Sequence, residues 1–215
     1  MKKVYVSAVL LLVAVFSFAQ QRDPKAKAIL DAASAKFKSY QTVTATFAYA
    51  SQNAQGKVMA KKSGTILMKG DKFNISFGNN KIFSDGKTVW NYDPSSKEVT
   101  VNNANKSEST ITPQKLFTDF YSKDFMYVMG NDTKVAGKPV NVIIMQPIDK
   151  NKAFSRLYLA VDKAARTIAS ATIVEKNGNR TVYSVGSLKA NKPMSDAQFS
   201  FDPAKYPGVE VVDLR

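Results

Sequence analysis

Histidine and cysteine are both absent from this chain of 215 residues. Without histidine there can be no Ser-His-Asp triad and no imidazole to transfer protons, and without cysteine there is no thiolate nucleophile. The usual ligands of a protein zinc site are missing as well. No disulfide can form, so burial alone must stabilise the fold, and a precursor anchored through a lipid-modified cysteine is excluded. The absence of these two residue types excludes most hydrolase mechanisms.

Carboxylates and glycines could support other chemistry, but their placement is that of structural residues. Paired carboxylates can act as acid and base, yet most of the candidates stand in or beside turns, where aspartate bonds to the backbone. The glycines are scattered singly, mostly at turns, and none forms a phosphate-binding loop. We therefore expect neither catalysis nor a cofactor. The carboxylates concerned are Asp71, Asp85, Asp93, Asp119, Asp124, Asp149, Asp162 and Glu175.

The first residues have the pattern of a secretory signal peptide. Lys2 and Lys3 precede an unbroken apolar run over residues 8–16, and Ser17 and Ala19 are the small side chains that a signal peptidase reads. The run is shorter than the roughly 20 residues of a membrane-spanning helix. We expect a signal peptide at 1–19, cleaved after Ala19, and a single mature domain at 20–215, long enough to bury a sizeable core. The alternative is an uncleaved N-terminal anchor.

Basic residues outnumber acidic ones by 31 to 17, which gives a formal net charge of +14 at pH 7. Such a balance favours acidic partners. Nucleic acid is not expected, because the protein is predicted to be exported and its lysines are spread along the chain rather than clustered with aromatic residues. Anionic membrane surfaces and acidic proteins fit this charge better.

Residue periodicity predicts one amphipathic helix followed by many short strands. Over residues 24–40, Ile29, Ala33 and Phe37 recur at helical spacing. From residue 42 the period changes to two, as in a strand with one buried face. Tight turns between the strands indicate one large antiparallel sheet, curled into a barrel or folded into a sandwich. Strands are expected at 42–49, 57–62, 64–69, 72–77, 81–83, 88–92, 98–102, 125–129, 139–146, 155–162, 167–175, 180–188 and 198–201.

A second short helix is expected after Thr112 and Pro113, an N-cap and a first helical residue. Two short helices cannot cover so long a sheet. Large apolar side chains nevertheless alternate along several strands, which leaves two interpretations: an ordinary packed core, or a cavity that binds an apolar ligand. The alternating residues include Ile66 and Met68, then Phe73, Ile75 and Phe77, then Trp90 and Tyr92.

The segment SDGKTVWNYDP at residues 84–94 resembles a turn of the LolA family of periplasmic outer-membrane lipoprotein carriers. Further motifs are similar and stand in the same order: GTILMK at 64–69, the Thr112-Pro113 helix, FSFDP at 199–203 and PGVEVVD at 207–213. The resemblance implies a mainly β fold, an incomplete and unclosed antiparallel β-barrel of about 11 strands. A helical lid would lie across its open side, over an apolar interior.

The same resemblance implies a function and a site. The protein would be a periplasmic chaperone that takes the acyl chains of lipoproteins from an inner-membrane ABC transporter complex to an outer-membrane receptor or the outer membrane itself. We expect a monomer. Where family members carry an arginine that secures the lid, this chain has Gly70 after Lys69, and Lys69 is expected to contact the lid instead. The residues implied to bind acyl chains are Phe37, Phe47, Ile66, Met68, Phe73, Ile75, Phe77, Trp90, Leu116, Phe117 and Phe120.

Two other functions stay open. The protein could be a soluble periplasmic lipid- or glycolipid-binding or sensing module on the same fold, and the identity of its ligand would separate this function from that of a carrier. It could instead be a non-catalytic interaction domain whose sheet interior is fully packed. A dry, filled interior would single out this last alternative.

Overall fold

The computed structural model describes residues 22–104 and 121–215. Its first helix, α1, spans Pro24–Lys38, which confirms the helix expected over residues 24–40. Asp23 caps it by accepting hydrogen bonds from the backbone N–H groups of Lys25 at 2.7 Å and Ala26 at 3.2 Å. Lys36 and Lys38 stand in the last turn, where positive charge suits the helix dipole. One side of the helix is buried, at Ala26, Leu30, Ala33 and Ser34.

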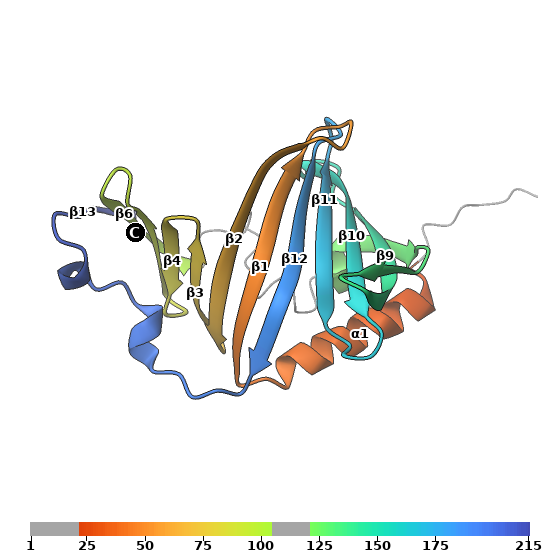
Figure 1. Ribbon diagram of the computed structural model, residues 1–215, viewed down its shortest axis with the longest axis horizontal. Coiled ribbons are helices and arrows are strands. Elements are labelled where there is room, and N and C mark those ends of the chain that lie inside the picture. Colours follow the sequence, from red (N-terminus) through yellow and green to blue (C-terminus); the bar gives the residue numbers. More distant parts are fainter. Residues whose placement is uncertain (1–21, 105–120) are drawn as a thin grey trace, which may run out of the picture.

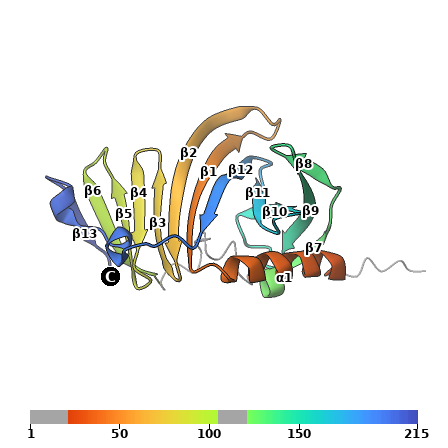
Figure 2. The ribbon, with the colours of Figure 1, turned by 60° about the horizontal axis from the view of Figure 1, so that its bottom comes forward.

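The strands of the described chain form a single 13-stranded sheet. Its order is β13-β6-β5-β4-β3-β2-β1-β12-β11-β10-β9-β7, with β8 paired to β9 alone. Its two ends, β13 and β7, do not pair, so the sheet is unclosed; Figures 1 and 2 show it curling along its length. The strands are β1 Thr42–Gln52, β2 Val58–Lys69, β3 Lys72–Phe77, β4 Asn80–Ser84, β5 Thr88–Asp93, β6 Glu98–Asn103, β7 Phe125–Met129, β8 Thr133–Val135, β9 Lys138–Pro147, β10 Phe154–Asp162, β11 Ile168–Glu175, β12 Arg180–Ala190 and β13 Glu210–Asp213.

The unclosed, mainly β architecture predicted from the sequence is confirmed, with differences in detail. The expected strands at 57–62 and 64–69 are one continuous strand, β2. Residues 198–201 are not a strand: Ser195 caps a short 3-10 helix, η2, over Asp196–Phe199. The chain then forms a second such turn, η3, at Pro203–Lys205, and ends in β13, which pairs parallel to β6. Residues 112–120, where a second helix is expected, lie outside the described residues. The described chain resumes at Tyr121 with the short helix α3, Tyr121–Asp124.

Strand alternation gives the sheet two faces. The helix face carries Val43, Ala45 and Phe47 of β1 and the residues paired with them, and α1 lies across it at the β7 to β11 end (Figure 2). The back face carries Thr42, Thr44 and the residues opposite those. The C-terminal segment, residues 194–213, crosses the back face of the β3 to β6 end.

Three apolar clusters hold these layers together. The first packs Ala26, Leu30 and Ala33 of α1 against β7, β9, β10 and β11 on the helix face. The second lies on the same face over β1, β2 and β3. The third joins Phe83 and Val99 to Phe201 on the back face. No helix in the described ranges is long and apolar enough to cross a membrane.

Candidate functional site

Three cross-strand rows form an apolar surface on the helix face of β1, β2 and β3. The register places Val43 opposite Met68, which lies opposite Phe73. The next row runs from Ala45 through Ile66 to Ile75. Residues directly opposite each other in antiparallel strands share a face and pack together. The third row is Phe47, Gly64 and Phe77.

Aromatic rings extend the third row along the sheet. The Phe47 and Phe77 rings stack with their centroids 5.8 Å apart, and Tyr49 meets the Phe77 ring edge-on at 5.4 Å. Tyr183 of β12 continues the row, 5.6 Å from Tyr49. The Nζ of Lys62 lies 5.4 Å from the centre of the Phe77 ring, a cation–π contact. The row is therefore a broad apolar platform with one cation at its edge.

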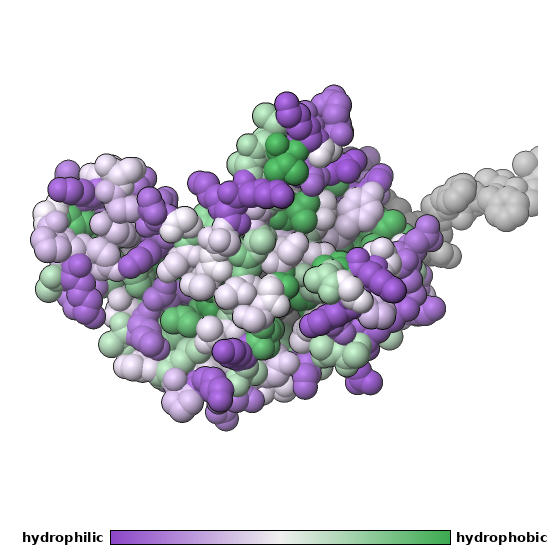
Figure 3. All heavy atoms as spheres, in the orientation of Figure 1, coloured by the Kyte–Doolittle hydropathy of each residue, from purple (hydrophilic) through white to green (hydrophobic). Residues whose placement is uncertain are grey.

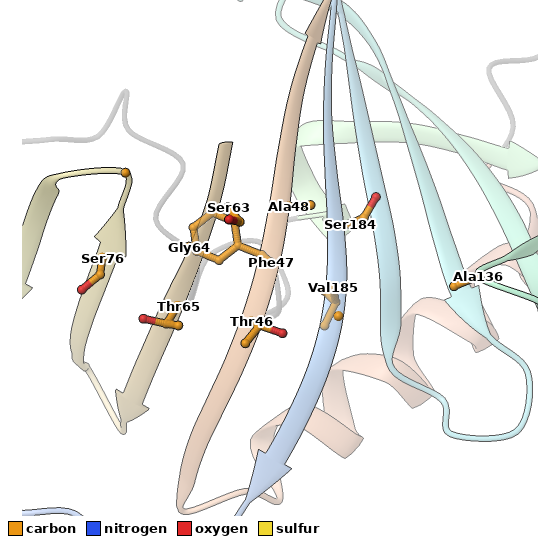
Figure 4. Close-up of a pocket in the computed structure, with 12 residues that line it drawn as sticks. Thr46, Phe47, Ala48, Ser63, Gly64, Thr65, Ser76, Ala136, Ser184 and Val185 are labelled. Carbon is orange, nitrogen blue, oxygen red and sulfur yellow. The ribbon is translucent and has the colours of Figure 1, made fainter. Parts of the chain in front are cut away.

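The platform depends on a close contact between an aromatic ring on β1 and a glycine on β2. The Phe47 ring reaches from β1 across to Gly64 on β2, as Figure 4 shows. A Cβ atom on Gly64 would stand 2.5 Å from the Phe47 Cζ, which is too close for any side chain. Glycine is thus required here by the ring, and the ring lies flat along the sheet because glycine leaves room.

The end of α1 covers only part of the apolar surface. Phe37 and Tyr40 pack against the β1 to β3 cluster, with their ring centroids 6.4 Å apart. Val43, Met68 and Phe73, each one residue from the end of its strand, are buried, whereas other apolar residues of this surface stay half-buried. Incomplete cover leaves apolar area that a ligand can take up. The half-buried set is Phe37, Tyr40, Phe47, Ile75, Phe77, Ile82, Val89 and Leu188.

The electrostatics of this surface are those of an apolar site. Burial, followed by the neighbouring Tyr49, raises the pKa of the Tyr183 hydroxyl above its ordinary value. Across the described ranges every buried side-chain nitrogen or oxygen has a hydrogen-bond partner. Those ranges hold no cluster of three or more side chains able to bind a metal ion. What this surface offers a ligand is area and shape, with few polar contacts.

Comparison with known proteins matches most of this chain to one family. Residues 38–202 fit the family described as outer membrane lipoprotein carrier protein LolA. The chain belongs to the LolA family. An outer-membrane lipoprotein carrier protein of Pasteurella multocida is 27% identical over 177 residues, 80% of this chain and 81% of that protein. One from Haemophilus influenzae is 28% identical over 189 residues, 86% of this chain and 82% of that protein.

Solved structures agree on the fold. An uncharacterized conserved protein of Thermus thermophilus has a TM-score of 0.61 at 14% identity, over 88% of this chain and 99% of that one. The lipoprotein LppX of Mycobacterium tuberculosis has a TM-score of 0.53 at 11% identity, over 80% and 98%. The description of the LolA family and the names of these relatives are those of carriers of outer-membrane lipoproteins.

Most of the acyl-binding residues expected by resemblance to LolA come together on the helix face. The rows and the end of α1 contain seven of them, whereas three fall outside the described residues: Leu116, Phe117 and Phe120. Sequence reasoning missed Tyr49, Tyr183 and Ile82, which only the strand register brings to this surface. The seven that come together are Phe37, Phe47, Ile66, Met68, Phe73, Ile75 and Phe77.

Trp90 is separated from this LolA site. It lies opposite Phe83 and Val101, on the back face, and packs in the cluster that Phe201 completes. Large apolar residues occur on both faces of β4 and β5 because the C-terminal segment covers the back face there. The grouping of Trp90 with the helix-face residues was therefore wrong.

Lys69 also turns to the back face, where it holds the C-terminal segment. Its Nζ donates to the Met194 carbonyl oxygen at 3.1 Å and to the Asp196 carboxylate at 2.8 Å, and Lys72 binds the same carboxylate at 2.7 Å. These two ammonium groups lower the pKa of Asp196 to about 2. Strand alternation points Lys69 away from α1, which differs from the expected lid contact. In this LolA member the lysine fastens a different segment.

A separate hollow of about 600 Å³ lies over β1, β2 and β12 (Figure 4). Most of the side chains that line it are small, and Phe47 and Gly64 are shared with the aromatic row. Figure 3 shows residues of intermediate hydropathy, drawn in white, over the middle of the sheet. The hydroxyl side chains of the hollow lie on the back face, on the opposite side of the sheet from the rows, and they make the hollow less apolar than the LolA site. Its hydroxyl-bearing residues are Thr46, Ser63, Thr65, Ser76 and Ser184.

Proposed function

We propose that the protein is a periplasmic chaperone that carries lipoproteins from the inner to the outer membrane with their acyl chains on the helix face. It would receive them from an inner-membrane ABC transporter complex and release them to an outer-membrane receptor or to the membrane itself. Membership of the LolA family supports this role. The signal peptide at 1–19, cleaved after Ala19, would deliver the mature domain at 20–215 to the periplasm, where we expect it to work as a monomer.

The observation that carries the proposal is the half-buried apolar surface next to the end of α1. Each methylene that leaves water is stabilised by about 0.8 kcal/mol, so a lipoprotein cannot cross an aqueous compartment without its chains being covered. Phe47, Ile75 and Phe77 provide flat and branched apolar groups that are not already filled by packing. Met68, buried in the same cluster, adds a flexible side chain that can repack beneath chains of different shapes.

Release requires that binding be incomplete. A carrier that buried its cargo in a closed core would bind too tightly to transfer it, whereas an unclosed sheet leaves one side of the bound chains accessible. The half-buried aromatic row of Phe47 and Phe77 also argues against the alternative of an interaction domain with a fully packed interior. In that alternative the aromatic row would be buried like Phe199, which is 0% exposed.

The test is binding of a synthetic triacylated lipopeptide to the mature protein, measured by calorimetry beside the unacylated peptide. Two neighbouring residues of β3 give a matched pair of variants: Ile75→Glu places a charge on the helix face, and Ser76→Glu places the same charge on the back face. We expect Ile75→Glu to weaken binding at least tenfold, which is about 1.4 kcal/mol, because an unpaired carboxylate is costly in apolar surroundings. Ser76→Glu should bind as the parent does.

Native mass spectrometry of the protein purified from a diderm bacterial host identifies the natural cargo. Acylated polypeptide in the complex supports the carrier function. Free phospholipid or glycolipid in its place would favour a lipid-binding module on the same fold. Failure to bind either the lipopeptide or any natural lipid would refute both functions.

A further inference from the structure

Three connections between strands meet at one end of the sheet and form a single projecting surface. They are the β1–β2 turn, the β11–β12 turn and the β9–β10 connection, and Figure 1 shows the first two side by side at the top. The Ala54 Cβ stands 3.0 Å from the point where a Cβ on Gly178 would be. The Nζ of Lys176 donates to the Lys150 carbonyl oxygen at 2.7 Å. We call this surface the hairpin tip and define it as residues 53–61, 148–153 and 176–180.

The hairpin tip is strongly basic. It carries six lysine and arginine residues but only one carboxylate, Asp149, with Glu175 just beside it. All six basic side chains are exposed, and none belongs to an ion pair found in the described ranges. Their charge is therefore available to an anionic partner. The six are Lys57, Lys61, Lys150, Lys152, Lys176 and Arg180.

Exposed apolar side chains lie among these charges. Met59 is 64% exposed, Val58 41% and Ile148 47%, and these are half of the six large apolar residues exposed in the described ranges. Met59 stands at a β-bulge: Ser51 pairs with Ala60 and Gln52 with Val58, so Met59 has no partner across the strand. A bulge re-aims a side chain, here into solvent. Figure 3 shows apolar and hydrophilic residues next to each other on this end.

We propose that the hairpin tip docks on the surface of a membrane that contains anionic phospholipids. The basic side chains bind the headgroups, while Val58, Met59 and Ile148 enter the boundary between headgroups and acyl chains. Basic residues with apolar neighbours are the features that hold a protein at a bilayer surface. The tip projects beyond the neighbouring strand ends (Figure 1), which suits a flat, fluid partner better than a folded acidic protein. Docking of the hairpin tip on a membrane is separate from binding of the cargo on the helix face.

The experiment is flotation of the mature protein with vesicles of phosphatidylglycerol and phosphatidylethanolamine at 50 and 300 mM salt. Near an anionic surface each basic residue strengthens binding about fivefold. The variant Lys57→Gln/Lys61→Gln/Lys176→Gln should therefore bind at least tenfold more weakly at low salt. Its matched control, Lys87→Gln/Lys134→Gln/Lys138→Gln, removes the same charge from exposed lysines at the other end of the strands and should bind as the parent does.

A second pair of variants tests the apolar part. Val58→Ser/Met59→Ser should lose the binding that persists at 300 mM salt, whereas Val211→Ser/Leu214→Ser, which changes two exposed apolar residues elsewhere, should not. The Ile75→Glu variant should keep its vesicle binding even when it no longer binds lipopeptide, which separates this inference from the carrier function. Absence of binding to anionic vesicles, equal losses in both lysine variants, or binding to polyglutamate but not to vesicles would each overturn the proposal.

Discussion

The Phe47 ring on β1 occupies the space in which a side chain at position 64 on β2 would stand. A Cβ there would also collide with the Ser76 carbonyl oxygen of β3, so three adjacent strands meet at this glycine. A backbone oxygen cannot move aside as the end of a side chain can. The aromatic row of the candidate site and the close packing of β1, β2 and β3 are consequences of the same residue.

Gly64→Ala is therefore expected to destabilise the protein by about 1–3 kcal/mol, the usual cost of adding a methyl group where a core is already filled. Urea unfolding followed by circular dichroism measures the change. Ser63→Ala next to it removes a hydroxyl from an exposed residue and should change stability by less than about 0.5 kcal/mol. Equal stability of Gly64→Ala and the parent would mean that the Phe47 ring and the Ser76 carbonyl oxygen do not restrict position 64.

The carboxylate of Asp196 fastens the C-terminal segment to β2 and β3 through Lys69 and Lys72. Its pKa is lowered to about 2 from an ordinary value of 3.8. The carboxylate therefore stabilises the attached segment fully above about pH 4, and this contribution disappears as the pH falls from there through 2. Hydrogen exchange of residues 194–206, measured by mass spectrometry from pH 5 down to pH 2, should show protection that decreases over this interval.

Asp196→Asn removes the titrating group. The amides of residues 194–206 should therefore be less protected at pH 5 in this variant, and their protection should no longer change between pH 4 and pH 2. Asp202→Asn is the comparison, because Asp202 accepts a backbone hydrogen bond from Ala204 and leaves both lysines untouched. A pH dependence that persists in Asp196→Asn would assign the effect to another carboxylate.

Local pattern was enough to predict much of this fold. The helical spacing of Ile29, Ala33 and Phe37 predicted α1, and residues 125–129 were predicted as the strand that is now β7. Both depend on neighbours close in sequence. The candidate site depends on register as well: Phe47, Gly64 and Phe77 meet only because β1, β2 and β3 pair as they do.

The features that could not be predicted from the sequence depend on contacts between residues far apart in the chain. Trp90 and Tyr92 do alternate as expected, but alternation does not say which side the C-terminal segment covers. Phe199 and Phe201 also alternate like strand residues, yet Ser195 starts a 3-10 turn before them and both rings are buried by packing on the sheet. β13 pairs parallel to a strand more than a hundred residues earlier in the chain, a choice that no local signal encodes.

Tyr183 should report on the occupancy of the site. Its pKa is raised first by burial and second by Tyr49, so the neutral phenol is favoured in the folded protein. The stabilisation is complete below the ordinary pKa of 10.0 and is lost as the pH rises through the higher folded value. A bound acyl chain removes more water from this ring, and NMR titration of 13C-labelled tyrosine should show a further rise of its pKa with lipopeptide. Tyr49→Phe should lower the pKa of Tyr183, and an unchanged pKa on lipopeptide binding would place the cargo elsewhere.

The single tryptophan, Trp90, tests whether the cargo binds on the helix face and not on the back face. Trp90 lies in the back-face cluster with Phe201, whose ring stacks on Tyr206 at 4.6 Å. Phe201→Ala should destabilise the protein by about 3–5 kcal/mol because it empties a filled site, and it should shift Trp90 emission to the red by admitting water. Lipopeptide binding on the helix face should leave that emission unchanged, and so should Phe47→Ala, which alters only the helix-face row. A red or blue shift on lipopeptide binding as large as that of Phe201→Ala would show that the cargo reaches the back face, and the assignment of the site to the helix face would fall.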